Sequence, residues 1–248
     1  MGQKIHPIAY RLGLNKDWQA NWFSPRMSAQ FLREDILIRQ KIGKIFARKG
    51  ISATIIDRSG SKTKITIKTS KPGLLIGRGG IEIEKFRKDL TREIESLRKK
   101  YLAPNVKLRS AKNDIKIDVE EVKNIYLDAQ IVAQDVAEQL EKRMPFRRAL
   151  KQTIQKVMQQ KEAQGVRIRV SGRLDGAEMS RDEWLADGKM PLQTLRSNID
   201  YGQATSYNSY GTVGVKTWIF KGENFLTEDK EKSGNIDTKN RSFKGNRY

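Results

Sequence analysis

The sequence predicts an α+β protein of two consecutive folded units, the second of which packs two helices on a mainly antiparallel sheet. One observation is that segments with apolar residues at helical spacing are interspersed with segments of alternating apolar and polar residues. Another is that 37% of the 248 residues are hydrophobic, which suffices to build cores. The length is compatible with one or two domains.

The first unit is expected over residues 18–122, after a basic N-terminal arm at 1–17 that carries Lys4 and Arg11. A helix at about 28–49 is indicated by helical spacing and by a C-cap glycine: Phe31, Ile38, Ile42, Ile45, Phe46 and Gly50. Alternating patterns predict the strands of this unit, at 51–59, 61–70, 105–110 and 114–122. A short apolar helix and a glycine turn follow the second strand, and a long helix is then indicated by Ile83, Phe86, Leu90, Ile94 and Leu97.

The second unit is expected over residues 123–222. Two helical stripes predict its helices, the second beginning near Pro145: Ala129, Val132, Val136 and Leu140, then Phe146, Leu150, Ile154 and Val157. Alternation predicts strands in "VRIRVSGR", in "AEMSRDEWLADGKMPLQTL" and in "VGVKTWIFKGE". The polar remainder at 223–248 has almost no apolar period, so we expect a disordered tail.

The charge of the chain restricts its partners. Lysine and arginine outnumber acidic residues to give a formal net charge of +20, which favours nucleic acid over an anionic membrane surface. There is no cysteine, which excludes disulfides, a thiol nucleophile and thiolate metal sites, and fits a reducing cytoplasm. No apolar run approaches the ~18 residues of a membrane span, and the N-terminus lacks the features of a signal peptide.

The glycine turn "GRGG" at Gly77, Arg78, Gly79 and Gly80 has three possible phosphate-binding interpretations. A nucleotide P-loop needs Lys-Ser/Thr after its last glycine, but Ile81 and Glu82 follow here. A dinucleotide fingerprint fails at Glu82, whose carboxylate would repel a pyrophosphate. The Gly-x-x-Gly loop of a KH domain, which clamps single-stranded nucleic acid, does fit.

Leu74, Leu75, Ile76 and Ile81 would then form the apolar wall of its groove. The alternative is a tight turn between two helices, since two glycines at this spacing occur often by chance. The preceding order of helix, strand, strand and short helix, and the helix and strand that follow, match a type II KH arrangement.

Four peptides carry a more specific resemblance: "MGQKIHPIAYRLGL", "SGRLDGAEMSRDEW", "PLQTLRSNIDYG" and "YGTVGVKTWIFKGE". Over residues 1–223 the chain resembles the bacterial family of ribosomal protein three of the small subunit. Two segments, at about 91–118 and after 223, look longer than is usual in that family. The glycine turn reads Arg-Gly where a basic pair such as Lys-Lys is more usual, which halves the charge at its tip.

The resemblance implies an N-terminal type II KH domain followed by a second α/β domain. It implies a structural component of the small subunit rather than an enzyme, bound to the ribosome in the cytoplasm. Its partners would be small-subunit ribosomal RNA, mRNA and neighbouring proteins of the head, with no membrane, cofactor or small-molecule substrate.

A second basic cluster lies on the helix predicted after Pro145. Arg143, Arg147 and Lys151 fall at i, i+4 and i+8, and Arg148 lies beside this stripe. A solvated face is the usual fate of such a run, but no acidic residue lies between positions 143 and 161 to compensate it. The resemblance implies that Arg147, Arg148 and Lys151 lie at the mRNA entrance and help to unwind mRNA passively, driven by translocation.

Further arginines are candidates for contacts with ribosomal RNA. Arg167, Arg169 and Arg173 are expected to share one face of a predicted strand with period 2, and Lys4 and Arg11 lie on the arm. The alternative for the strand is edge charge that prevents aggregation.

We predict no catalytic residue and no metal site. His6 has no nucleophile or second histidine in support, and a nuclease would need convergent carboxylates beyond Asp118 and Glu120. The remaining alternative function is a free KH-type RNA-binding regulator, which would need neither the second unit nor the basic arm.

Overall fold

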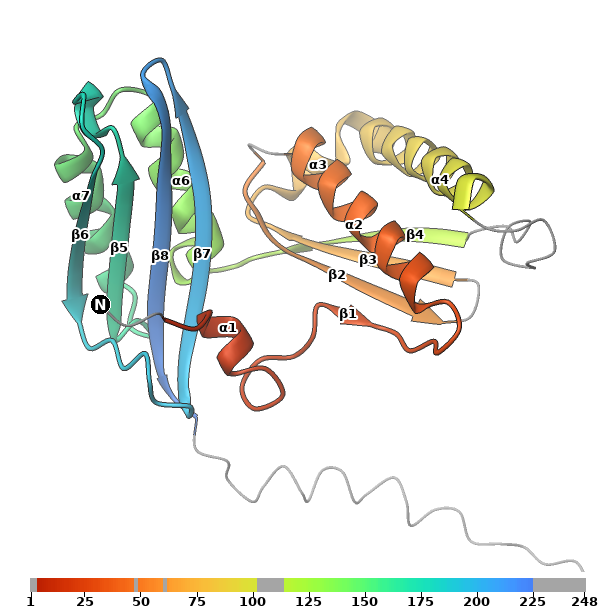
Figure 1. The fold of residues 1–248 in the computed structure, drawn as a ribbon, viewed down its shortest axis with the longest axis horizontal. Helices are drawn as coiled ribbons and strands as arrows, with labels where there is room; N and C mark the ends of the chain where they lie inside the picture. The colour runs from red at the N-terminus through yellow and green to blue at the C-terminus, as the bar shows by residue number, and fades with distance from the viewer. Residues whose placement is uncertain (1–3, 47–48, 60–61, 102–113, 225–248) are drawn as a thin grey trace, which may run out of the picture.

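Two four-stranded sheets, each with helices on one face, form the protein (Figure 1). The structure is a computed structural model that describes residues 4–46, 49–59, 62–101 and 114–224. The arrangement confirms the predicted α+β class, with the second sheet antiparallel throughout. Within these residues no helix is long and apolar enough to cross a membrane.

The first sheet has the strand order β1-β2-β3-β4. β2 and β3 are antiparallel, whereas β1 runs parallel to β2 and β4 runs parallel to β3. Its strands are β1 (Ala20–Asn21), β2 (Ile51–Ser59), β3 (Lys62–Thr69) and β4 (Asp114–Glu121). Its helices are α2 (Ser28–Ile45), the short α3 (Pro72–Ile76) and α4 (Ile81–Tyr101). Figure 1 shows α2 and α4 next to each other on the same side of this sheet.

The core of the first unit follows the predicted stripes. The buried apolar side chains come from α2, β2, β3, α3, α4 and β4: Ile38, Ile42, Phe46, Ile56, Ile65, Ile67, Leu75, Phe86, Leu90, Ile94 and Ile115. Ile45, which the helical spacing also included, is half exposed because α2 ends there. The strand predicted at 105–110 lies outside the described residues.

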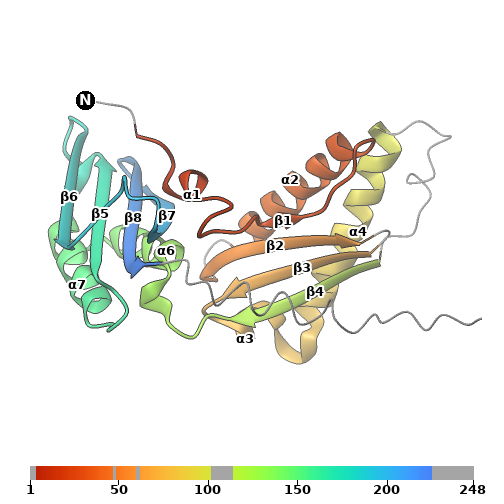
Figure 2. The same ribbon diagram turned by 90° about the horizontal axis from the view of Figure 1, so that it is seen from below.

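The second sheet has the strand order β6-β5-β8-β7. Its strands are β5 (Gly165–Gly172), β6 (Arg181–Gly188), β7 (Ser197–Asn208) and β8 (Gly211–Glu223). The helices α6 (Ala129–Glu141) and α7 (Phe146–Met158) pack on one face, and apolar residues of β5 and β8 meet them there: Val166, Ile168, Val170, Val213, Val215 and Ile219. The short helix α1 (Pro7–Tyr10) lies beside β7 on the other face (Figure 2).

The strand β7, which has 12 residues and pairs with β8, was not predicted from the sequence. Two of its buried positions are the polar residues Ser197 and Ser206, both fully buried, so the apolar alternation is absent. A third is Gly202, where an added Cβ would lie 2.3 Å from the carbonyl oxygen of Ala129. The small side chains let α6 lie directly on the strand, and this removes the very pattern that would reveal it.

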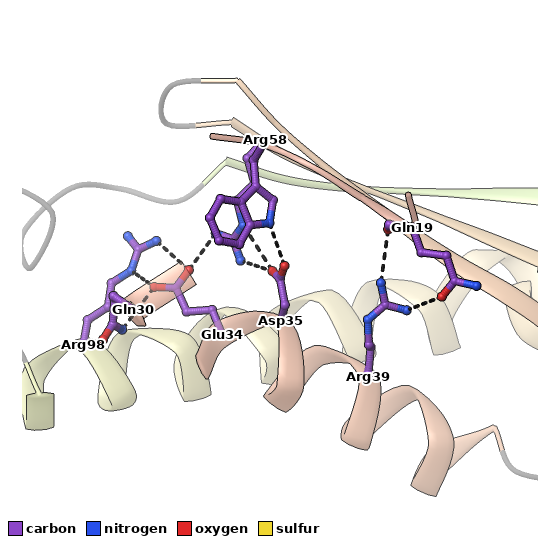
Figure 3. Close-up of polar contacts among 8 residues, drawn as sticks. Gln19, Gln30, Glu34, Asp35, Arg39, Arg58 and Arg98 are labelled. Carbon is purple, nitrogen blue, oxygen red and sulfur yellow. Dashed lines mark hydrogen bonds and ion pairs between the residues drawn. The ribbon is translucent and has the colours of Figure 1, made fainter. Parts of the chain in front are cut away.

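A buried ionic network ties α2 to α4 and β2 (Figure 3). The fully buried Glu34 accepts hydrogen bonds from Arg98 Nε at 2.6 Å and from Arg58 Nη1 at 2.7 Å. Arg58 Nη2 also donates to Asp35 at 2.6 Å, and Trp22 Nε1 donates to the same carboxylate at 2.8 Å. The network therefore joins the segment before α2, two helices and a central strand.

Glu34→Gln should lower the free energy of unfolding by about 3–5 kcal/mol at neutral pH, because it removes the buried carboxylate charge that Arg58 and Arg98 share. Burial alone would raise the pKa of Glu34, but hydrogen bonds from Arg98 and the charges of Arg58 and Arg98 outweigh it and lower the pKa. This stabilisation is present above the ordinary glutamate pKa and is lost as the pH falls through the lowered pKa of the folded state.

Urea denaturation across the acid range measures both effects. Glu95→Gln, at an exposed position of α4, is the matched control and should change stability little. Equal stability of the two variants at pH 7 would contradict the structural role of the network.

Candidate nucleic-acid interface

The glycine turn joins α3 to α4 through three glycines with positive φ. Gly77 has φ 73° and ψ 178°, Gly79 has φ 60° and Gly80 has φ 77°, so all three use backbone conformations that favour glycine. A Cβ on Gly77 would lie 2.8 Å from Cγ of Glu82, whereas Gly79 and Gly80 face open space. The tip of the turn can therefore be approached closely from outside.

The surroundings of the turn combine charge with exposed apolar side chains. Arg78 is exposed at the tip, and Leu74, Ile76 and Ile81 beside it are also exposed. Leu75, which the sequence analysis placed in the same wall, is fully buried in the core, which corrects that assignment.

A lysine that the sequence analysis did not connect with the turn also lies there. Lys49 Nζ donates to the Leu74 carbonyl at 2.7 Å and to Glu82 at 2.8 Å. The strands β2 and β3 separate Lys49 from the turn in the sequence, and the antiparallel pairing of these strands brings the two together.

The basic stripe of α7 lies on the solvent side of its helix. Arg147, Arg148 and Lys151 are exposed, whereas Phe146 and Leu150 are buried against the sheet. Arg143 is exposed in the turn between α6 and α7, where its φ is 61°, so it lies before the stripe rather than on the helix.

Charges from β6 meet the stripe. Arg147 Nε lies 3.6 Å from an oxygen of Glu183, and Arg181 Nε lies 3.3 Å from the other oxygen. Both guanidinium groups lie 5.6 Å from the centre of the Phe146 ring. The acid that compensates the α7 cations, Glu183, lies on β6 and not on the helix, so the helix sequence alone does not reveal it. The same strand adds another cation, Arg181.

Arg11 does not occupy the position expected of an RNA contact. Its side chain is fully buried, and its guanidinium donates to backbone carbonyls of Ser197, Leu192 and Thr194 at 2.8 Å each and of Pro7 at 3.1 Å. The structure corrects the prediction, because a guanidinium that is fully buried and bound to these carbonyls is not accessible to a phosphate. Arg11 instead fastens the arm to the segment between β6 and β7.

The other predicted RNA-binding cations are in different situations. Lys4 is exposed on the arm. Arg173 lies beyond the end of β5 and donates to the carbonyls of Ala177 at 2.8 Å and Tyr210 at 3.2 Å, so it supports a turn. Arg167 and Arg169 share the sheet face opposite the helices, and Arg169 pairs with Asp182. Only these last two therefore lie together as the alternation predicted.

The carboxylates considered for metal binding are paired with lysines. Asp118 lies 3.4 Å from Lys64 and 3.3 Å from Lys116, and Glu120 lies 3.7 Å from Lys68. The part of the chain that the structure describes contains no cluster of three or more histidine or acidic side chains that could hold a metal ion.

Comparisons with known proteins divide the chain in the same order as the two sheets. A model described as "KH domain" matches residues 37–125, and one described as "Ribosomal protein S3, C-terminal domain" matches residues 136–219. The first match confirms the predicted KH domain.

Three similar proteins carry the name "Small ribosomal subunit protein uS3". The protein of Syntrophomonas wolfei is 43% identical over 232 residues, 94% of each chain. That of Lawsonia intracellularis is 45% identical over 232 residues, 94% of this chain and 100% of the relative. That of Oleidesulfovibrio alaskensis is 44% identical over 223 residues, 90% of this chain and 96% of the relative.

Arg11→Ala should release the arm from the second sheet while leaving the rest folded, because the arm loses its bonds to three carbonyls outside the arm, those of Ser197, Leu192 and Thr194. Each lost bond to a charged donor contributes about 1.5–3 kcal/mol, so the opening free energy of the arm should fall by several kcal/mol. Amide hydrogen exchange should then accelerate for residues 8–16. Lys4→Ala, on the same arm but exposed, is the control. Unchanged protection in the Arg11 variant would show that other contacts hold the arm.

Proposed function

Because the chain belongs to the uS3 family of small ribosomal subunit proteins, we propose that it is a structural RNA-binding component of that subunit. In this role it binds small-subunit ribosomal RNA and neighbouring proteins in the head, in the cytoplasm and attached to the ribosome. It also forms part of the mRNA entrance, where it assists passive unwinding. The role requires no cofactor, small-molecule substrate or membrane.

The observation that carries the mRNA role is the exposed row of Arg147, Arg148 and Lys151 on α7. Phe146 and Leu150, which are 2% and 1% exposed, fix the opposite side of the helix in the core. The row is therefore held on a rigid element rather than on a loop, which favours a defined path for a strand of RNA. Four residues of helix rise about 6 Å, so the charges follow one another along the helix axis.

The proposed mechanism uses electrostatics and needs no chemical step by this chain. The cations attract the phosphates of the arriving strand and release its counterions, which favours a strand lying against α7. Translocation by the ribosome supplies the movement that opens base pairs ahead of this contact. The glycine turn lacks the Lys-Ser/Thr of a P-loop, which agrees with a role that hydrolyses no nucleoside triphosphate.

A second RNA-binding surface is proposed at the glycine turn. Arg78, Gly79 and Gly80 are accessible, and the N-terminus of the 21-residue helix α4 begins at the next residue. Helix N-termini attract phosphate through their free N–H groups and the helix dipole.

We also propose a division into an arm at 1–17, a KH domain at 18–122, a C-terminal domain at 123–222 and a tail at 223–248. It is supported by the two separate hydrophobic clusters, one under each sheet. Most of the proposed tail lies outside the described residues.

The combined variant Arg147→Ala, Arg148→Ala and Lys151→Ala should leave folding intact and slow translation through a structured mRNA at least about threefold, since three exposed cation contacts of about 0.2–1 kcal/mol each total about 0.6 kcal/mol or more. Translation of an unstructured mRNA by the same ribosomes should change little. The matched control removes three exposed cations of α4, through Lys88→Ala, Arg92→Ala and Lys99→Ala. A rate through the structured mRNA equal to that of the unaltered protein would rule out the role of α7.

Arg78→Asp with Gly79→Asp should weaken binding of the isolated protein to single-stranded RNA and reduce the salt dependence, by about 0.7 in the logarithmic slope for each lost phosphate contact. Aspartate tolerates the left-handed backbone of Gly79, and nothing lies within 4 Å of its Cβ position, so the turn should persist. The control Arg87→Asp with Ser96→Asp makes the same charge change on the exposed side of α4. An affinity and slope equal to those of this control would show that the turn only connects two helices.

A further inference from the structure

A groove runs along the face of the second sheet that α6 and α7 leave uncovered. We call it the sheet groove; its volume is about 950 Å³, within the range of sites that hold organic ligands. Its floor is formed by β5, β7 and β8, one wall is the N-terminal arm, and the other is the segment between β6 and β7. The lining residues are Lys4–Arg11 except Ile8 and Ala9, Arg167, Arg169, Met190–Thr194, Tyr201, Lys216 and Trp218.

The walls of the sheet groove are fixed by Arg11. Its guanidinium binds the carbonyls of Leu192 and Thr194 at 2.8 Å, and Tyr10 Oη donates to the Gln193 carbonyl at 3.2 Å. These contacts hold the arm against the segment between β6 and β7. The groove is therefore present before any ligand arrives, which lowers the entropic cost of binding.

The floor of the sheet groove presents aromatic rings. Tyr201 on β7 and Trp218 on β8 lie side by side with ring centroids 5.4 Å apart, and the His6 ring meets Tyr201 edge-on at 4.7 Å. The guanidinium of Arg167 lies 5.8 Å from the Trp218 ring centre and 4.4 Å from that of Trp184 on the neighbouring strand β6. Flat π-surfaces and a guanidinium plane are the groups on which unpaired bases stack.

The charge of the sheet groove is positive. Lys4, Arg167, Arg169 and Lys216 line it, and none of its lining residues is acidic. Arg167 differs from Arg11 in that its guanidinium makes no hydrogen bond to any described residue, and its Nε is buried without a partner there. The fold thus gives all three nitrogens of the Arg11 guanidinium backbone carbonyl partners, whereas the hydrogen-bonding capacity of Arg167 is unused among the described residues.

We infer that the sheet groove binds a short unpaired segment of RNA, with bases against Tyr201, Trp218 and Arg167 and phosphates near Lys4 and Lys216. The inference rests on the proposed RNA-binding function and names the form of RNA that this surface takes. Bases in a duplex are stacked on one another, so a duplex could use the four cations but not the aromatic floor. An acidic peptide would likewise use the charges and leave the rings without a role.

The test uses the full-length protein and a 12-nucleotide oligouridylate that contains photoreactive 4-thiouridine, compared with a 12-base-pair RNA duplex. Crosslinks should fall in the peptides that span residues 197–221. Trp218→Leu should weaken binding of the oligouridylate about tenfold by removing a stacking surface, with duplex binding unchanged. Lys216→Gln should reduce the logarithmic salt slope by about 0.7, while Lys161→Gln, an exposed lysine in the turn after α7, should not.

Other results would overturn the inference. Crosslinks confined to the glycine turn or α7 would leave the proposed function standing and remove the groove from it. Equal loss of single-strand and duplex binding would mean contact with phosphates alone, and displacement of the crosslinks by a 12-residue oligoglutamate would point to an acidic protein segment. Failure of the unaltered protein to bind either RNA would reject the proposed function as well. If circular dichroism shows that Trp218→Leu is unfolded, the inference is tested by the crosslink positions of the unaltered protein and by the salt slope of Lys216→Gln.

Discussion

A buried guanidinium needs partners for its N–H groups, and this requirement sorts the arginines of the protein. In the first unit Glu34 and Asp35 meet Arg58 and Arg98 and join α2, α4 and β2 into one layer. In the second unit backbone carbonyls meet Arg11 and fasten the arm to the sheet. Where the fold supplies such partners an arginine is structural, and where it does not the arginine remains available for a polyanion.

The net charge of +20 therefore does not mean that every cation of the chain is available to contact RNA. Among the described residues, three cationic surfaces stand out: the glycine turn at Arg78, the α7 row around Arg147, and the sheet groove around Arg167, while other exposed cations lie on α4. Each lies on a rigid support, since helices back the first two and a four-stranded sheet backs the third. A protein that contacts RNA from several rigid surfaces can fix the relative positions of separate RNA segments, which suits a structural role.

The two units and the arm meet around two partly buried aspartates, Asp128 and Asp200. Asp128 caps α6 and accepts a hydrogen bond from Ser52 of the first unit, and Asp200 of β7 pairs with Lys16 at 3.2 Å. Burial and the nearby charge of Asp200 raise the pKa of Asp128. Burial would also raise the pKa of Asp200, but Lys16 and Lys221 outweigh it and lower the pKa. These contacts connect the first unit, which carries the glycine turn, to the second unit, which carries α7.

The sequence by itself determined the α+β class, the helices after the arm, most strands and the exposed rows, because amphipathic periodicity and glycine spacing are local properties of the chain. It identified Gly77, Arg78, Gly79 and Gly80 as a turn and Arg147, Arg148 and Lys151 as a stripe. Only the tertiary structure decided that Arg11 is buried, that Glu183 and Arg181 join α7, and that Ser197, Gly202 and Ser206 belong to a strand. These depend on contacts between segments far apart in sequence, where the partner of a charge or the space beside a glycine is set by packing and leaves no periodic trace.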